Sequence, residues 1–207
     1  MKNEIKDRNT EQNILDAAEA IFLEKGYSGT TTTEIAKRAG VNHAMLHYYY
    51  RTKENLFEII FEKQVKNIAN SFLSIVNDNK TFTEFVVEAI ERHFDFIKQN
   101  PKTIIFIISE INNNSVSKEL WNKYSQTIFK QVIINLKGKM EKEIAAKQIR
   151  DIDPVDFLLT VLSLNVFVFI ALPLFKSANV FPNNEIVKFL DRRKKENIRI
   201  ALLALKL

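Results

Sequence analysis

The sequence predicts an all-α protein of about nine helices, three small ones followed by six that are mostly longer. Its 207 residues include 4 Gly and 4 Pro, the residues that most often interrupt helices. Apolar residues recur three or four positions apart along most of the chain, which is the spacing of one helical face. The run Ile104–Ile108 has strand propensity, but the preceding Pro101 and the lack of a second strand-like run favour a helix there too.

The first helix is expected over about Thr10–Lys25, where an apolar stripe follows the segment. Gly26 is predicted to end this helix as a left-handed cap, and Tyr27 to fold back onto its last turn. The stripe consists of Ile14, Ala17, Ala18, Ile21 and Phe22.

Two short helices separated by a turn are expected next. Thr31 and Glu34 have the spacing of a capping box, in which a hydroxyl and a carboxylate satisfy each other's backbone N–H groups. The pattern predicts a helix over Thr32–Ala39, a turn at Gly40 and a second helix over Asn42–Tyr49.

The helices after Thr52, which is suited to an N-cap, are expected to be longer. Of the 16 Phe residues, only Phe22 precedes Thr52, so the change in composition also lies there. The remaining helices are predicted from apolar spacing and from the Asn-Pro and Asp-Pro starts. They are expected over about 53–76, 82–97, 101 onward, 120–144, 153–175 and 184–206.

Composition excludes several classes of site. The chain has no cysteine, which rules out disulfides, thiolate metal sites and a cysteine nucleophile. The net charge of +5 is compatible with nucleic acid, but residues 1–53 hold eight Lys or Arg and seven Asp or Glu, so charge alone locates no site. The basic run Arg192–Lys195 is interpreted as a solvated helix face. The polar N-terminus does not resemble a signal peptide, so a cytoplasmic location is expected.

The pattern Thr32-x3-Ala36-x3-Gly40-x5-Leu46 indicates a helix-turn-helix. Two short helices that cross closely need a small residue where they touch, and Ala36 supplies it. Gly40 allows the positive φ of the turn, and Leu46 anchors the second helix to the core. The opposite face of the second helix is then free to enter a DNA major groove.

The segment Gly26–Leu56 closely resembles the N-terminal domain of the TetR family of bacterial repressors. The resemblance implies a helix-turn-helix DNA-binding domain over residues 1–52 and a helical ligand-binding and dimerisation domain over 53–207. It also implies a non-enzymatic repressor that a small effector, here expected to be apolar or amphipathic, releases from a palindromic operator. The residues that carry it are Thr30-Thr31-Thr32-Thr33, Ile35-Ala36, Ala39-Gly40-Val41, Tyr48-Tyr49-Tyr50 and Thr52-Lys53-Glu54.

The same resemblance assigns DNA contacts residue by residue. Phosphate or backbone contacts fall on Thr32, Thr33, Tyr49 and Lys53. The start of the recognition helix is Asn42, His43 and Ala44, and His47 and Tyr48 lie in or along the major groove. Tyr50 takes a buried structural position. Three of these positions, His43, Ala44 and His47, depart from the family's usual Lys or Arg, Gly and Tyr.

Residues 42–50 carry no formal charge but offer amide, imidazole and phenol groups that suit base edges and phosphates. The alternative is a tyrosine cluster that packs a small core, although three consecutive tyrosines cannot all face inward on one helix. His43 and His47 also have the spacing of metal ligands. A zinc site needs three or four ligands, and no further ligand is evident nearby, so no metal or cofactor is expected.

The later helices offer candidates for an effector site, because small-molecule cavities are mostly apolar with a few polar anchors. His93 lies on an apolar stripe and is either a core histidine or a polar anchor in such a cavity. The ligand-binding candidates are Phe72, Phe85, His93, Phe96, Phe106, Trp121 and Tyr124. Core packing alone produces a similar pattern of Phe and Ile.

The segment Phe157–Phe175 has 19 uncharged residues, which is the length of a membrane span. The favoured interpretation is a penultimate helix that is buried by its own core and by a partner subunit. A homodimer through about 153–175 and 184–206 is therefore expected, with no membrane contact, and Leu164 and Val168 are candidate interface residues. The alternative functions are a regulator without ligand and a membrane-tethered regulator that uses Phe157–Phe175.

Overall fold

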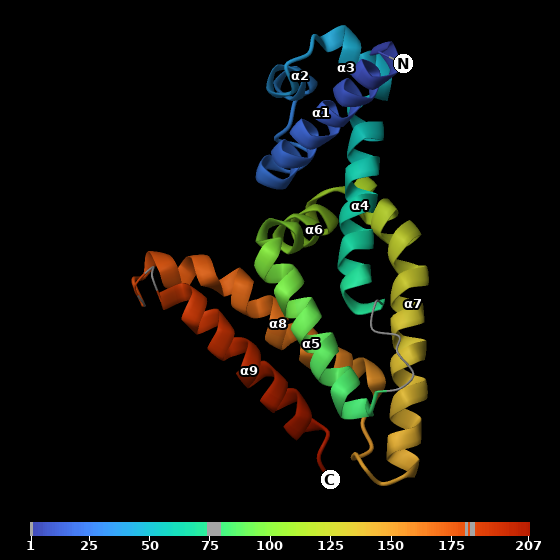
Figure 1. Cartoon of the computed structure of the whole chain (residues 1–207), viewed down its shortest axis with the longest axis vertical. Helices are drawn as coiled ribbons and strands as arrows, with labels where there is room; N and C mark the ends of the chain where they lie inside the picture. The colour runs from blue at the N-terminus through green and yellow to red at the C-terminus, as the bar shows by residue number, and fades with distance from the viewer. Residues whose placement is uncertain (1, 74–79, 181, 183–184) are drawn as a thin grey trace. The chain divides into compact units, whose positions relative to one another are not determined.

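The computed structural model describes residues 2–73, 80–180, 182 and 185–207, and within them it holds nine helices and no strand (Figure 1). The all-α prediction is confirmed, and the run Ile104–Ile108 is helical. The helices are α1 (Lys2–Lys25), α2 (Thr32–Ala39), α3 (His43–Tyr50), α4 (Lys53–Leu73), α5 (Phe82–Gln99), α6 (Pro101–Asn113), α7 (Ser115–Ala145), α8 (Pro154–Ser177) and α9 (Ile186–Ala204).

Several predicted boundaries moved. The first helix begins at Lys2 rather than Thr10. The predicted start was too late because the first turns are polar and carry no apolar stripe. Asn42 precedes α3 as its N-cap and accepts a hydrogen bond from the Met45 N–H at 2.8 Å. The predicted end of the fourth helix near position 76 and the predicted start at Asn184 lie outside the described residues.

The helix starts are set by local side-chain hydrogen bonds. Thr81 and Glu84 form a complete capping box at the start of α5. Asp153 caps α8 by accepting from two backbone N–H groups, and Pro154 takes the first helical position, where no N–H is needed. Pro101 likewise takes the first helical position of α6.

Contacts within the chain divide it into two compact units. Unit 1 comprises Met1–Lys66 and Lys102–Ser125, and unit 2 comprises Asn67–Pro101 and Gln126–Leu207. Helix α6 therefore belongs with the helix-turn-helix, whereas α4 and α7 each contribute residues to both units. The predicted domain boundary between residues 52 and 53 stays a prediction.

Unit 1 has an aromatic core drawn from α1, α4 and α6. The Phe57 ring lies edge-on to Phe22, with centroids 5.1 Å apart, and edge-on to Phe106 at 6.0 Å. Phe61 also packs on Phe106 at 6.0 Å. Edge-to-face pairs of this kind add to the free energy gained from burying the rings. The core therefore fixes α1, the support of the helix-turn-helix, against α4 and α6.

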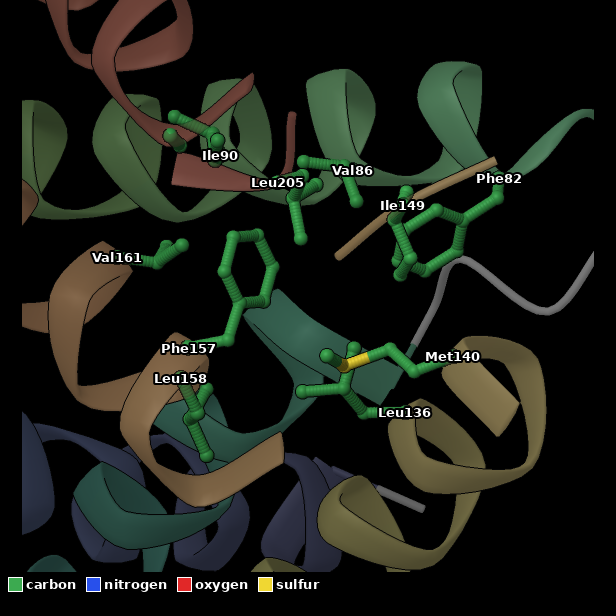
Figure 2. Close-up of a cluster of buried hydrophobic side chains, with 11 residues drawn as sticks. Phe82, Val86, Ile90, Leu136, Met140, Ile149, Phe157, Leu158, Val161 and Leu205 are labelled. Atoms are coloured by element: carbon green, nitrogen blue, oxygen red, sulfur yellow. The ribbon is translucent and has the colours of Figure 1, made fainter. Parts of the chain in front are cut away.

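Unit 2 has a separate apolar core formed by α5, α7, α8 and α9, with Phe157 near its centre (Figure 2). Ile149 and the neighbouring Arg150 lie in the connection before α8, and Arg150 Nε donates to the Ala204 carbonyl at 2.6 Å. That bond holds the end of α9 beside this connection. The other buried members are Phe82, Val86, Ile90, Leu136, Met140, Leu158, Val161, Ala201 and Leu205.

Helix α8 is long and apolar enough to cross a membrane, and it is the one such helix among the residues the structure describes. In its most apolar stretch, 44% of the residues are buried inside the protein. Its buried residues include Phe157, Asn165 and Phe169, whereas Phe167 and Leu174 are 66% and 70% exposed. One side of α8 thus packs into the core of unit 2, and the other side exposes apolar side chains.

Candidate nucleic-acid interface

Helices α2 and α3 form the helix-turn-helix that the spacing predicted. Gly40 caps α2 with φ of 69°, the left-handed conformation expected for the turn. The Val41 N–H then donates to the Ala36 carbonyl at 3.0 Å. Ala36 and Leu46 are both buried, at 4% and 1% exposure, as the helix crossing and the core anchor require.

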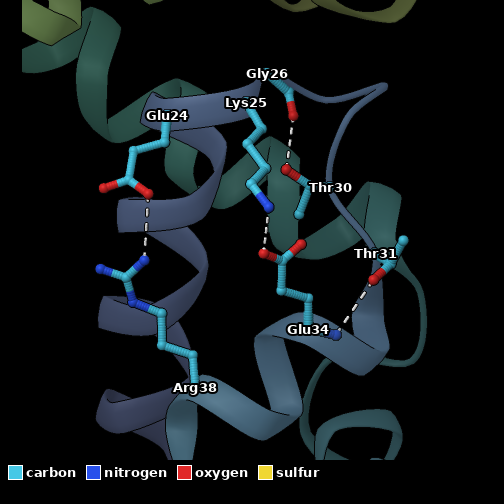
Figure 3. A network of polar contacts seen from close by, with 7 residues as sticks. All are labelled: Glu24, Lys25, Gly26, Thr30, Thr31, Glu34 and Arg38. Atoms are coloured by element: carbon cyan, nitrogen blue, oxygen red, sulfur yellow. Dashed lines mark hydrogen bonds and ion pairs between the residues drawn. The ribbon is translucent and has the colours of Figure 1, made fainter.

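Salt bridges and hydrogen bonds hold α2 to the end of α1 (Figure 3). Lys25 Nζ lies 2.5 Å from Glu34 Oε1, and Arg38 Nη1 lies 3.4 Å from Glu24 Oε2. Thr31 Oγ1 accepts from the Glu34 N–H at 3.2 Å. The predicted capping box is therefore half formed: the hydroxyl caps α2 as expected, while the Glu34 carboxylate pairs with a lysine of α1.

The exposed side of α3 carries most of the predicted base-reading groups. Asn42, His43, Ala44 and His47 are exposed, and Tyr48 is 69% exposed. This face is therefore open to a major groove.

The three consecutive tyrosines take different positions. Tyr48 is exposed, Tyr49 is half-buried, and Tyr50 is buried with its hydroxyl donating to the Glu11 carbonyl at 3.1 Å. Burial raises the pKa of Tyr50. The core-packing alternative thus describes Tyr50, the residue assigned a structural position, and does not describe Tyr48.

The start of α2 meets the start of α3. Thr32 Oγ1 and His43 Nε2 lie 3.0 Å apart, which brings two predicted DNA-contacting residues together; Thr33 beside them is exposed. Helix N-termini present unpaired N–H groups and a partial positive charge that favour phosphate. Among the described residues, no cluster of three or more His, Asp or Glu side chains suited to a metal is found.

Lys53, the predicted phosphate contact, begins α4 and lies against Tyr27. Its Nζ is 4.1 Å from the centre of the Tyr27 ring, a cation–π distance. The Tyr27 hydroxyl donates to Glu54 Oε1 at 2.5 Å, and burial followed by this carboxylate raises the tyrosine pKa to about 12. The sequence predicted that Tyr27 folds back onto α1, and its ring does stack with Phe22 at 6.4 Å; its contact with Lys53 was missed.

The predicted ligand-binding residues do not gather in one place. Phe106 is buried in the aromatic core of unit 1, and the Tyr124 hydroxyl donates to Glu58 Oε1 at 3.2 Å in the same unit. Trp121, also in unit 1, is half-buried, as are Phe85 and Phe96 of unit 2. The side chain of Phe72 lies outside the described residues. Their role in ligand binding stays a prediction.

His93 belongs to a buried polar cluster in unit 2 that sequence analysis missed, formed by His93 of α5, Asn165 of α8 and Asn197 of α9. Asn165 Nδ2 donates to the Ile90 carbonyl at 3.0 Å and lies 3.3 Å from His93 Nδ1. Asn197 Nδ2 donates to Asn165 Oδ1 at 2.9 Å. Burial lowers the pKa of His93 to about 3. The structure therefore places His93 in the core as a neutral imidazole.

One hollow lies along the outward side of α8 and α9, with a volume of about 660 Å³. It is mostly apolar, and Ser163 and Arg193 are its polar members. None of the predicted ligand-binding residues lines it. Its other lining residues are Leu164, Phe167, Val168, Ile170, Ala171, Phe175 and Phe189.

Comparison with known proteins agrees with this geometry. A family model described as bacterial regulatory proteins, tetR family, matches residues 14–60, which contain α2 and α3. The chain is similar to IcaR, the HTH-type negative transcriptional regulator of the biofilm operon icaADBC. It is 30% identical to the Staphylococcus epidermidis protein over 143 residues, covering 59% of this chain and 75% of that protein. For IcaR of Staphylococcus aureus strain Newman the identity is 29% over 133 residues, covering 64% of this chain and 66% of that protein, just under two thirds.

Two solved structures share the fold. HlyIIR, a hemolysin II transcriptional regulator, is 27% identical with a TM-score of 0.62, covering 97% of this chain and 99% of that one. AibR, crystallised in complex with isovaleryl coenzyme A and operator DNA, is 20% identical with a TM-score of 0.61, covering 77% of this chain and 85% of that one.

Proposed function

Because the chain belongs to the tetR family of bacterial regulatory proteins, we propose that it is a ligand-responsive repressor that binds operator DNA through α2 and α3 in the cytoplasm. The observation that carries the proposal is the exposed, uncharged face of α3 beside the N-terminus of α2. IcaR is a negative transcriptional regulator, which supports repression. Selection of bound fragments from a random DNA pool tests the proposal, and failure to enrich any duplex would contradict it.

Within this proposal the exposed side chains of α3 and of its N-cap read bases. His47 and Tyr48 offer imidazole and phenol groups that can pair with base edges. Asn42 offers its Nδ2 donors, because its Oδ1 caps α3. Phosphate contacts come from the helix starts and from Lys53, because backbone N–H groups and a cation complement the phosphate charge. The remaining proposed contacts are Thr32, Thr33, His43, Ala44 and Tyr49.

Replacing Lys53 by alanine should weaken binding to all duplexes by about tenfold, the value of one charge-assisted hydrogen bond. The slope of log affinity against log salt concentration should fall by about one, because one phosphate is no longer neutralised. Fluorescence anisotropy over a salt series measures both. Lys66→Ala is the control, since Lys66 is an exposed cation of α4 that pairs with Glu62. An unchanged salt slope for Lys53→Ala would remove Lys53 from the interface.

We further propose that the protein acts as a homodimer through α8 and α9. Several large apolar side chains on these helices are exposed, an arrangement that is costly in water and that a two-fold interface commonly covers. Phe167 is among the most exposed, whereas Val168, an interface candidate from the sequence, is 8% exposed and lies in the wall of the hollow. The exposed large apolar residues of α8 and α9 are Val155, Leu159, Phe167, Ile170, Leu174, Phe175, Val187 and Leu203.

An effector is proposed to release the DNA by favouring a different arrangement of α4, which begins at Lys53. Such coupling is reciprocal: if the effector weakens operator binding by about 5- to 150-fold, the operator weakens effector binding by the same factor. Calorimetric titrations with and without selected operator DNA measure this, with isovaleryl coenzyme A, the ligand of AibR, as the first compound. Measurable binding with equal affinity in both titrations would show that the protein does not sense that compound.

A membrane-tethered regulator is the second candidate, because α8 has the length and composition of a span. The buried side of α8 argues against it. Asn165 is fully buried and hydrogen-bonded to α5 and α9, so moving α8 into lipid would break polar contacts that hydrocarbon cannot replace. Recovery of the full chain in the membrane fraction rather than the detergent-free supernatant would favour tethering.

A further inference from the structure

Glu110 of α6 is a buried carboxylate in unit 1 that binds the turn after α1. The residue is 7% exposed, and its Oε1 accepts from the Tyr27 N–H at 2.9 Å. Its Oε2 accepts from Ser117 Oγ at 3.1 Å and from Asn114 Nδ2 at 3.4 Å. Both oxygens are therefore engaged, and the orientation of the carboxylate is fixed from α6 and α7.

The turn is shaped to receive this carboxylate. Gly26 has φ of 69°, and a Cβ atom built on it would lie 2.4 Å from Glu110 Oε1. Thr30 Oγ1 closes the turn by donating to the Gly26 carbonyl at 2.7 Å. The close approach of Glu110 thus depends on a glycine at position 26, and the bond to the Tyr27 N–H follows from that approach.

Tyr27 in turn contacts the start of α4. Its ring packs edge-on against Phe57 at 4.8 Å, and Lys53 Nζ lies 4.1 Å from the ring centre. The hydroxyl is held by Glu54. Backbone, ring and hydroxyl of one residue therefore connect α6, the aromatic core and the first turn of α4.

We propose that Glu110 and Tyr27 are positioning residues for the Lys53 phosphate contact, so that α6 sets the strength of DNA binding through the turn after α1. The proposal rests on the proposed function, in which Lys53 binds phosphate. Glu110 fixes the backbone of Tyr27, and the Tyr27 ring holds the lysine ammonium before DNA arrives.

The physical basis is preorganisation. A lysine side chain loses much rotamer freedom when it binds a fixed phosphate. A cation–π contact already restricts that freedom in the free protein, while the ammonium keeps N–H groups that can face a phosphate. If the turn shifts, the ring moves and the lysine must be ordered at the moment of binding, which lowers affinity.

The test is a double-mutant cycle with mixed-sequence duplex and with the duplex that the wild-type protein selects from a random pool. Glu110→Gln and Tyr27→Leu should each weaken binding by about three- to fivefold, the range of an exposed cation–π contact. In the Lys53→Ala background each effect should fall below about twofold, because coupled residues are not additive. Tyr27→Phe keeps the ring and should bind nearly as the wild type does. Glu119→Gln, an exposed acid of α7, is the matched control.

Amide hydrogen exchange at Tyr27 supplies a second readout. The glutamine amide oxygen is a weaker acceptor than the Glu110 carboxylate, so exchange at Tyr27 should speed while exchange in α3 stays unchanged. If Glu110→Gln does not fold, Glu110→Asp, which keeps the charge but shortens the reach, replaces it with the same expected result.

Effects of Glu110→Gln and Tyr27→Leu that are equal in the wild-type and Lys53→Ala backgrounds would overturn the proposal. If Lys53→Ala still weakens DNA binding by about tenfold in the same cycle, the proposed function stands although this proposal fails. Failure of the wild-type protein to select any duplex would instead refute the proposed function.

Discussion

Phe167→Glu should convert the proposed dimer into a monomer and reduce operator affinity by at least about a hundredfold. The Phe167 side chain is 66% exposed on α8, and a two-fold interface would bury it together with its symmetry mate. Two carboxylates placed in an apolar contact pay a desolvation cost of several kcal/mol. A monomer would also bind only one half-site of the operator, so the affinity gained from linking two half-sites is lost.

Sedimentation velocity and anisotropy with selected operator DNA measure the two outcomes. Ile134→Glu is the matched control, because Ile134 of α7 is an exposed apolar residue, at 52%, outside α8 and α9. That variant should remain dimeric and bind DNA. Val168→Glu is a poorer test, because Val168 is 8% exposed and a charge placed there would also destabilise unit 2. A dimeric Phe167→Glu protein would mean that the interface lies elsewhere.

Acidification below pH 6.5 should destabilise the protein through His93. Its pKa is lowered from the ordinary 6.5 to about 3 in the folded chain. Between these two values the unfolded chain binds a proton that the folded chain does not, so the free energy of unfolding falls as pH falls. At about 1.4 kcal/mol per unit, the contribution lost between pH 6.5 and pH 5 is about 2 kcal/mol, and about 4–5 kcal/mol at most by pH 3.

Urea unfolding at pH 7.5 and pH 5 measures this loss. Because Asn165 Nδ2 lies beside His93 Nδ1, protonation of that nitrogen would place two donors against each other. His93→Gln keeps a polar side chain but cannot titrate, so its unfolding free energy should vary less with pH over this interval. His47→Gln, at an exposed residue of α3, is the control and should behave as the wild type does. Equal pH dependence of the wild-type and His93→Gln proteins would exclude His93 as the cause.

The elements that the sequence predicted best are those with local signals. The turn at Gly40 and the helix caps at Thr31 and Asp153 depend only on contacts with nearby backbone. The structure has each of them where the sequence predicted it. Gly138 lies inside α7, which continues through it, because one exposed glycine costs a helix only about 1 kcal/mol. The start of α1 was missed because polar turns leave no periodic trace.

The contacts that sequence analysis missed are long-range and polar. Glu110 meets the Tyr27 backbone across 83 residues, and Asn165 meets Ile90 across 75. Apolar periodicity predicts which side of a helix is buried. It does not predict which polar atom of another element a buried polar side chain will contact. The ligand-binding candidates show the same limit: an aromatic stripe such as the one containing Phe106 has the same composition whether it fills a core or lines a cavity.

The glycines of this chain differ in which substitutions they should tolerate during evolution. Position 138 has open space around it, so almost any inherited replacement is tolerated. Position 40 also has open space but a left-handed backbone, so asparagine is the natural substitute. Position 26 combines the left-handed backbone with a carboxylate oxygen 2.4 Å from any added carbon, and two independent obstacles must be removed at once. Replacement of glycine at position 26 should therefore be rare, and it should most often accompany a change at residue 110 that removes the carboxylate from the turn.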